Sequence, residues 1–168
     1  MKLNKLLALG VMVLSLSVGC SKKQTVNPED TLGGSGGEVT DSDLGNPGMA
    51  DSDSGNAMGM QTINFPFDSF EIVGQEREKL RGNIAILKEN ATVAVQVEGH
   101  CDERGGIQYN LALGEKRANA VKQQLVAGGI SGARVTTISM GKEKPVATGS
   151  DEGAWAQNRR ANFVITAN

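Results

Sequence analysis

An acidic residue and an arginine, Asp102 and Arg117, are the two side chains whose types and spacing best fit ligand binding. Asp102 lies within the segment Gly99–Gly105, directly after a stretch of alternating apolar and polar residues, and Arg117 lies in a longer segment with helical periodicity. A carboxylate at the end of a strand, set against a guanidinium on a helix, would form a clamp of two opposite charges. The sequence therefore predicts a site that acts through charge.

An alternating pattern predicts the strand that carries Asp102. Residues 92–98 alternate, with Val93, Val95 and Val97 on one face, which is typical of a half-buried strand. We expect Gly99 to end this strand. Asp102 then lies just past its carboxyl end, where ligands commonly bind in α/β folds.

A helix is predicted from Tyr109 to Ala127 because apolar residues recur there with helical spacing. Asn110 and Arg117 fall inside its apolar arc, whose other members are Leu111, Leu113, Ala118, Ala120, Val121 and Leu125. An arginine in such a position is costly to desolvate unless it is paired. Two interpretations remain open: a structural salt bridge from Arg117 to an acidic neighbour such as Asp102, or a ligand-binding role for both residues.

The remainder of residues 61–168 alternates short strands with helices. The patterns predict strands at 62–65, 134–140 and 162–166 and helices at 75–88 and 151–158. Trp155 in the last helix is expected to cover the core. Arg159 and Arg160 are expected to pair with acidic residues, although one of them could contact a ligand.

Enzymatic chemistry finds little support in the residue pattern. His100 is the single histidine and directly precedes Cys101, and neighbours in an extended chain point to opposite sides, so His100 is poorly placed as a base for this thiol. The adjacent carboxylates of Asp102 and Glu103 do not normally flank a bond from opposite sides, as a glycosidase requires. The spacing of zinc ligands is also missing. We therefore expect a binding protein with no metal and no cofactor.

The composition divides the chain of 168 residues into parts. A net charge of −2 and the lack of a basic stripe give no reason to expect nucleic acid as a partner. Residues 21–60 are acidic, rich in Gly, Ser and Asp, and without aromatic residues, which predicts a disordered linker. Within this linker the segment Asp41–Asn46 recurs as Asp51–Asn56.

The amino terminus has the pattern of a targeting segment. Lys2 and Lys5 precede the apolar stretch 6–18, which is short for a membrane span of about 20 residues. The junction before Cys20 resembles a bacterial lipoprotein cleavage site, although Ser17 stands where such sites usually carry leucine. We expect a signal peptide at residues 1–20 and lipidation of Cys20, and Ser21 resembles the signal for the outer membrane. A signal peptide cut at another bond is the alternative.

Four motifs in order relate residues 61–168 to a known family. The chain carries FDSF at 67–70, GHCDERG at 99–105, NLALGEKRANAV at 110–121 and NRRANF at 158–163. Together they resemble the family of OmpA-like C-terminal domains. The resemblance implies an α/β (α+β) fold of βαβαβ order, with a mixed sheet and helices on one side.

The same resemblance implies a ligand, the diaminopimelate of peptidoglycan stem peptides, bound without covalent chemistry. By motif Asp102 and Arg117 are its binding residues, and our further candidates are Asp68, Arg104, Asn110 and Leu113. Diaminopimelate carries an ammonium and a carboxylate on one carbon, which a carboxylate and a guanidinium together can recognise. Gly106 departs from the family pattern, which often has threonine there.

These inferences predict a lipid-anchored protein on the periplasmic face of the outer membrane that tethers this membrane to peptidoglycan. The resemblance further implies docking with proteins of the Tol envelope-constriction system. One alternative is an OmpA-like wall-binding lipoprotein without Tol partners. Another is a stator-like domain that anchors a motor, which the sequence disfavours because such chains carry a transmembrane helix.

Overall fold

The computed structural model describes residues 50–167. Its elements, in chain order, are β1 (Ile63–Asn64), α1 (Gln75–Glu89), β2 (Ala94–His100), α2 (Ile107–Ala127), the 3-10 turn η1 (Gly132–Arg134), β3 (Val135–Gly141), α3 (Glu152–Asn158) and β4 (Arg160–Ala167). The expected signal peptide, the lipidation site Cys20 and the linker up to residue 49 lie outside the described residues. None of the helices within residues 50–167 has the length and apolar character needed to cross a membrane.

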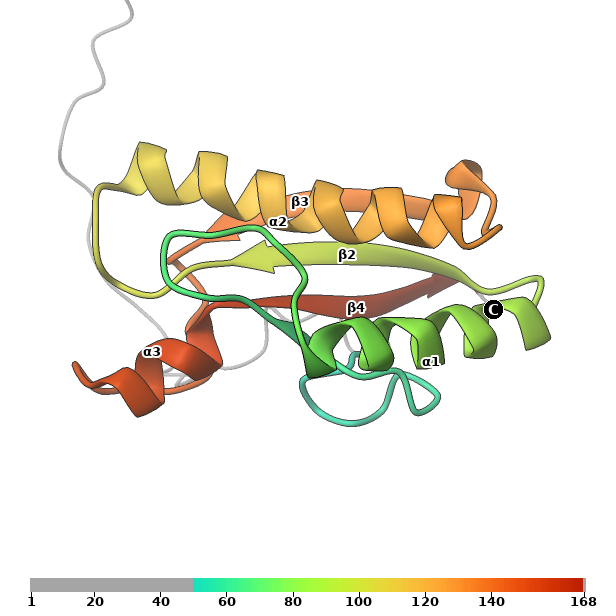
Figure 1. Cartoon of the computed structure of the whole chain (residues 1–168), viewed down its shortest axis with the longest axis horizontal. Helices are drawn as coiled ribbons and strands as arrows, with labels where there is room; N and C mark the ends of the chain where they lie inside the picture. The colour runs from blue at the N-terminus through green and yellow to red at the C-terminus, as the bar shows by residue number, and fades with distance from the viewer. Residues whose placement is uncertain (1–49, 168) are drawn as a thin grey trace, which may run out of the picture. The chain divides into compact units, whose positions relative to one another are not determined.

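The four strands form one mixed sheet with the order β1-β4-β2-β3. β2 is parallel to β3 and antiparallel to β4, which in turn pairs antiparallel with β1. Helices α1 and α2 cover the same face of this sheet, and α3 lies at the end where β4 begins (Figure 1). The expected mixed-sheet α/β fold with helices on one side is confirmed.

The core forms between the sheet and the two long helices. Val93, Val95 and Val97 are at most 1% exposed, which confirms the buried face predicted for residues 92–98. They share one hydrophobic cluster with helix residues that include Leu80, Leu87, Ala118, Val121 and Leu125. The prediction that Gly99 ends the strand is wrong, because Gly99 and His100 still pair with β3.

The predicted disordered linker is wrong in its last part. Residues 50–60, which we call the N-terminal strap, lie along β4, where the Ile165 N–H donates to the Ala50 carbonyl and the Ser52 N–H donates to the Phe163 carbonyl, both at 2.9 Å. The hydrophobic cluster includes Ala57 and Met60 from this strap. A Gly/Ser/Asp-rich composition argues for disorder only when no partner is available, and here the edge of β4 beyond β1 supplies unpaired backbone groups.

Polar side chains fasten the strap. The Asn162 Oδ1 accepts hydrogen bonds from the Ser52 N–H and hydroxyl and from the Asp53 N–H, at 2.8–3.1 Å. The Asp53 carboxylate pairs with the Arg160 Nε at 2.7 Å and accepts from the Thr62 hydroxyl at 2.9 Å. The second copy of the internal repeat is therefore part of the domain, and its second aspartate, Asp53, has a structural partner.

The end of β2 and the first half of α2 approach each other at two glycines. A Cβ atom added to Gly99 would overlap the Gly114 carbonyl oxygen, and one added to Gly114 would overlap the Ser139 hydroxyl. Only glycine at both positions allows the backbones to come so close. This approach brings Arg117, one turn further along α2, beside the loop that follows β2.

Candidate functional site

A cavity of about 200 Å³ lies beyond the carboxyl end of β2. All six predicted site residues line it: Asp68, Asp102, Arg104, Asn110, Leu113 and Arg117. They come from the loop after β1, the loop after β2 and the first half of α2. The structure thus brings three separated motifs to one cavity, and their role in binding remains a prediction.

Asp102 is held by two arginines. Arg104 donates from Nε to Oδ1 at 3.1 Å and from Nη2 to Oδ2 at 2.7 Å, and the Arg159 Nη1 lies 3.4 Å from Oδ2. Burial raises the pKa of the Asp102 carboxyl, but the hydrogen bonds and charge of Arg104, aided by Arg159, outweigh it and hold this pKa below its usual value. The cavity therefore presents an ionised, oriented carboxylate.

Arg117 does not form the structural salt bridge to Asp102 that was one of the two interpretations. Its Nε donates to the Ser69 carbonyl at 2.8 Å, Nη1 to the His100 carbonyl at 2.8 Å and Nη2 to the Pro66 carbonyl at 3.2 Å. Backbone oxygens therefore take the place of an acidic partner. Burial lowers the pKa of Arg117, yet arginine in proteins remains protonated.

The arrangement leaves binding capacity on both charges. A guanidinium has five N–H donors; three of those of Arg117 have the carbonyl partners just described, and the Cys101 thiol lies beside the same group at the wall of the cavity. Both carboxylate oxygens of Asp102 accept hydrogen bonds from arginines. An ammonium group of a ligand could take the place of one of these donors or bind beside it. A small molecule with both charges on one carbon matches this cavity by charge.

Asp68 enters the cavity from the loop after β1. Its backbone φ of 51° lies in the left-handed region, which aspartate tolerates better than most residues. The Tyr109 hydroxyl donates to the Asp68 carboxylate, and this hydrogen bond raises the pKa of Tyr109. Because Arg117 bonds the carbonyls of Pro66 and Ser69 on either side of Asp68, α2 holds this loop from both directions.

The other predicted residues shape the cavity. Arg104 stacks between two aromatic rings, 4.1 Å from the centroid of Phe67 and 4.0 Å from that of Trp155. The buried Asn110 donates from Nδ2 to the Arg104 carbonyl at 2.8 Å, which fixes the loop after β2 to α2. Leu113 supplies apolar wall. Such contacts keep the charged groups in place.

Sequence reasoning missed two aromatic residues of the site. Phe67 and Tyr109 line the cavity and are 61% and 54% exposed. Phe67 lies inside one of the four motifs and Tyr109 directly precedes another. The sequence pattern does not predict that these two aromatic side chains are exposed. Arg159 and Arg160 pair with acidic residues as expected, Arg159 with Asp102 and Arg160 with Asp53.

His100 and Cys101 have different partners in the structure and do not form a base–thiol pair. The His100 Nε2 lies 3.5 Å from the Glu98 carboxylate, whereas the Cys101 thiol faces the Asn110 carbonyl at 3.3 Å. Burial raises the pKa of Cys101, which opposes formation of a thiolate. Within residues 50–167 no group of three or more His, Cys, Asp or Glu side chains is arranged to hold a metal ion.

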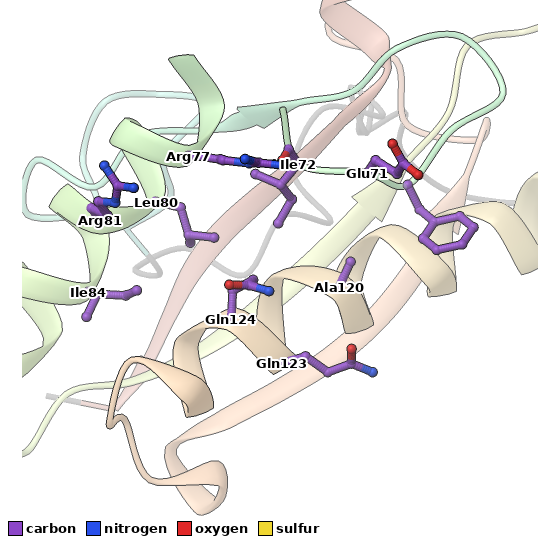
Figure 2. Close-up of a pocket in the computed structure, with 10 residues that line it drawn as sticks. Glu71, Ile72, Arg77, Leu80, Arg81, Ile84, Ala120, Gln123 and Gln124 are labelled. Carbon is purple, nitrogen blue, oxygen red and sulfur yellow. The ribbon is translucent and has the colours of Figure 1, made fainter. Parts of the chain in front are cut away.

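A larger groove of about 600 Å³ lies elsewhere, between α1 and α2, and includes none of the predicted site residues. Figure 2 shows Leu80 and Ile84 of α1 on one side and Ala120, Gln123 and Gln124 of α2 on the other. Its two arginines are engaged, Arg77 with the Ile72 carbonyl and Arg81 with Glu78. We place the candidate site in the smaller cavity because opposite charges converge there.

Comparison with known proteins identifies the class. The model of the OmpA family matches residues 64–159, and the chain belongs to this family. Within it, the chain is 40% identical over 97% of its length to the peptidoglycan-associated lipoprotein of Pseudomonas aeruginosa, of which it covers 97%. It is 39% identical to the protein of the same name from Rhizobium meliloti, with 92% of this chain and 84% of that protein aligned.

Solved structures agree on the fold. The peptidoglycan-associated lipoprotein of Burkholderia pseudomallei is 44% identical and superposes with a TM-score of 0.60, covering 62% of this chain and 89% of that one. The C-terminal domain of Helicobacter pylori MotB superposes with a TM-score of 0.58 at 20% identity, with 63% and 84% covered. At that identity the second likeness concerns the fold alone. The family resemblance inferred from the four motifs is confirmed.

Proposed function

We propose that this chain is a lipid-anchored outer-membrane protein whose OmpA-like domain binds peptidoglycan without covalent chemistry. The cavity that carries Asp102 and Arg117 is the observation on which the proposal depends. The names of the relatives, peptidoglycan-associated lipoproteins, support the polymer as ligand. The protein acts as a tether between outer membrane and cell wall, and it does not cleave the wall.

The ligand within the polymer is the diaminopimelate of the stem peptide. Its ammonium faces Asp102, and the carboxylate on the same carbon meets the guanidinium of Arg117 where this side chain lines the cavity. Asp68 adds a second acid on the same cavity. Two charge-assisted contacts made together favour a zwitterionic group over a simple amine.

Proteins of the Tol system are the proposed protein partners, on a surface that overlaps the wall site. Phe67, Ile107 and Tyr109 are each more than half exposed near the cavity. Exposed aromatic and aliphatic side chains of this kind are typical of the centre of protein interfaces. Partner and wall would then compete for the same face of the domain.

The test uses two stem peptides that differ by one group, the diaminopimelate peptide and its lysine counterpart, which lacks the terminal carboxylate. Calorimetric titration of the purified protein should detect binding of the diaminopimelate peptide. The affinity for the lysine peptide should be at least ten-fold lower. Equal affinity for both, or no binding to either, would overturn the proposed recognition.

Whole sacculi test the remaining parts. The protein should sediment with sacculi, release no muropeptides, and be displaced by added Tol proteins. Released muropeptides would indicate an enzyme instead. Sedimentation that Tol proteins leave unchanged would support the alternative of a wall-binding lipoprotein without Tol partners.

A further inference from the structure

Arg159 reaches the candidate site through Asp102 and does not line the cavity itself. It lies between α3 and β4, and its side chain is 7% exposed. Its Nε donates to the Phe65 carbonyl at 3.0 Å, Nη1 lies 3.4 Å from the Asp102 carboxylate and Nη2 donates to Glu152 at 2.6 Å. Three anchors on three different segments fix this guanidinium.

Arg104, the second arginine on Asp102, is less buried than Arg159 and has no backbone carbonyl as a partner of its guanidinium. Its side chain is 30% exposed, and its guanidinium has Asp102 and two aromatic faces as partners. An ammonium that approaches Asp102 must compete with Arg104, because Arg104 donates to both carboxylate oxygens. The partly exposed Arg104 has solvent on one side to which it could be displaced, whereas the buried Arg159 is enclosed by its three partners.

We propose that Arg159 is a positioning residue of the wall site, which holds the Asp102 carboxylate in its binding orientation when Arg104 gives way to the ligand ammonium. This inference rests on the proposed function. It assigns the two arginines different roles, one as an exchangeable partner and one as a fixed support. Without Arg159, Asp102 would be a nearly buried acid with no cationic partner once Arg104 is displaced.

The adjacent Arg160 provides a matched control. Its side chain pairs with Asp53 of the strap and is not among the residues that line the cavity. Arg160 is as buried as Arg159, so substitutions at the two positions remove similar charges from similar surroundings. Only one of the two contacts Asp102.

The experiment compares Arg159→Gln, Arg159→Lys and Arg160→Gln by calorimetric titration with the diaminopimelate stem peptide from pH 7 to pH 4, alongside thermal unfolding. We expect Arg159→Gln to bind about ten-fold more weakly at pH 7, the loss of one hydrogen bond to a charged group. Without Arg159 the effect of burial on Asp102 is less opposed, its pKa rises, and binding should fail at a higher pH than in the wild type. Arg159→Lys keeps the positive charge but loses the several N–H donors of the guanidinium. Its affinity and its pH profile should lie between those of the wild type and Arg159→Gln.

Arg160→Gln should melt earlier but keep the wild-type affinity and pH profile. An Arg159→Gln variant that binds and titrates like the wild type would overturn the inference while the proposed function stands. If the wild type itself fails to bind the peptide, the proposed function is wrong. Should Arg159→Gln not fold, the pH profile of Arg159→Lys decides, and a profile equal to the wild type overturns the inference.

Discussion

At the scale of single residues, Arg117 connects the stability of the domain to the candidate site. Its guanidinium joins the loop after β1, through Pro66 and Ser69, to the end of β2, through His100. It is 1% exposed, yet it also lines the cavity. One side chain therefore builds the site and contributes a charge to it, so its loss must show in both properties.

We expect Arg117→Ala to lower the free energy of unfolding by about 3 kcal/mol or more, because three carbonyls lose their donor and each unsatisfied buried group costs about 1–3 kcal/mol. Binding of the stem peptide should weaken by roughly ten- to several-hundred-fold. Arg117→Lys should fail nearly as badly, since one ammonium cannot reach three carbonyls and still offer a bidentate fork. Denaturant titration and calorimetry measure the two effects.

The neighbouring Lys116 supplies the control, because its ammonium lies over the exposed Phe70 ring at 5.7 Å and away from the cavity. Lys116→Ala should leave stability and binding nearly unchanged. Wild-type stability in Arg117→Ala would show that its hydrogen bonds to the carbonyls contribute little.

At the scale of elements, two contacts determine whether the site forms: the approach of α2 to β2 and the docking of the strap on β4. The first depends on Gly99 and Gly114, whose missing side chains let the two backbones meet. The second depends on backbone pairing and on the Asp53–Arg160 ion pair. Each can be disturbed without touching a residue of the cavity.

Gly99→Ala should destabilise the domain by about 3 kcal/mol or more, since the added methyl group meets a backbone oxygen that cannot move alone. We expect peptide binding to weaken as well, because α2 and Arg117 must shift away from the loop after β2. Gly106→Ala is the matched control, with no atom within 4 Å of the new Cβ. Thermal unfolding of both variants gives the comparison, and equal melting temperatures would argue against the close packing.

Asp53→Ala should cost roughly 2 kcal/mol, because it leaves the buried Arg160 without its carboxylate. The same substitution in the first copy of the repeat, Asp43→Ala, is the control, since we predict from the sequence that this copy belongs to the linker. Chemical denaturation of the full chain should therefore separate the two aspartates. Identical curves for both variants would show that the strap adds no stability.

At the scale of the whole molecule, the first residue of the strap and the cavity lie near opposite ends of β2. Ala50 bonds to Ile165, which pairs with Val95 near the start of β2, whereas the cavity lies beyond His100 at its end. At about 3.3 Å per residue the two points are some 15–20 Å apart along the strand. The proposed wall-binding cavity is therefore remote from the point at which the strap begins.

The proposed anchor at Cys20 predicts that Cys20→Ala abolishes lipidation and releases the protein from the membrane fraction. Two or more acyl chains are needed for stable attachment, so the loss should be complete. Cys101→Ala, at the buried second cysteine, should remain lipidated. Intact-mass measurement of the mature protein decides, and an unmodified Cys20 or a cut at another bond in the wild type would contradict the anchor.

The sequence by itself determined the elements and the family. Alternation at residues 92–98 and helical spacing from Tyr109 onward predicted the two elements that carry Asp102 and Arg117, because burial on one face requires apolar residues at the period of the element. The four motifs also indicated the residues that line the cavity. These signals are local, so they can be read without knowing which segments meet.

Tertiary structure decided the partners. Arg117 bonds carbonyls of the loop after β1 and of the end of β2, Asp102 meets Arg159, and Asp53 meets Arg160, all by proximity across segments far apart in the chain. A charged side chain takes whichever partner lies within hydrogen-bond reach after folding, and the strap is ordered because β4 offers it an unpaired edge. Neither fact has a local signature, since each depends on where a distant segment comes to rest.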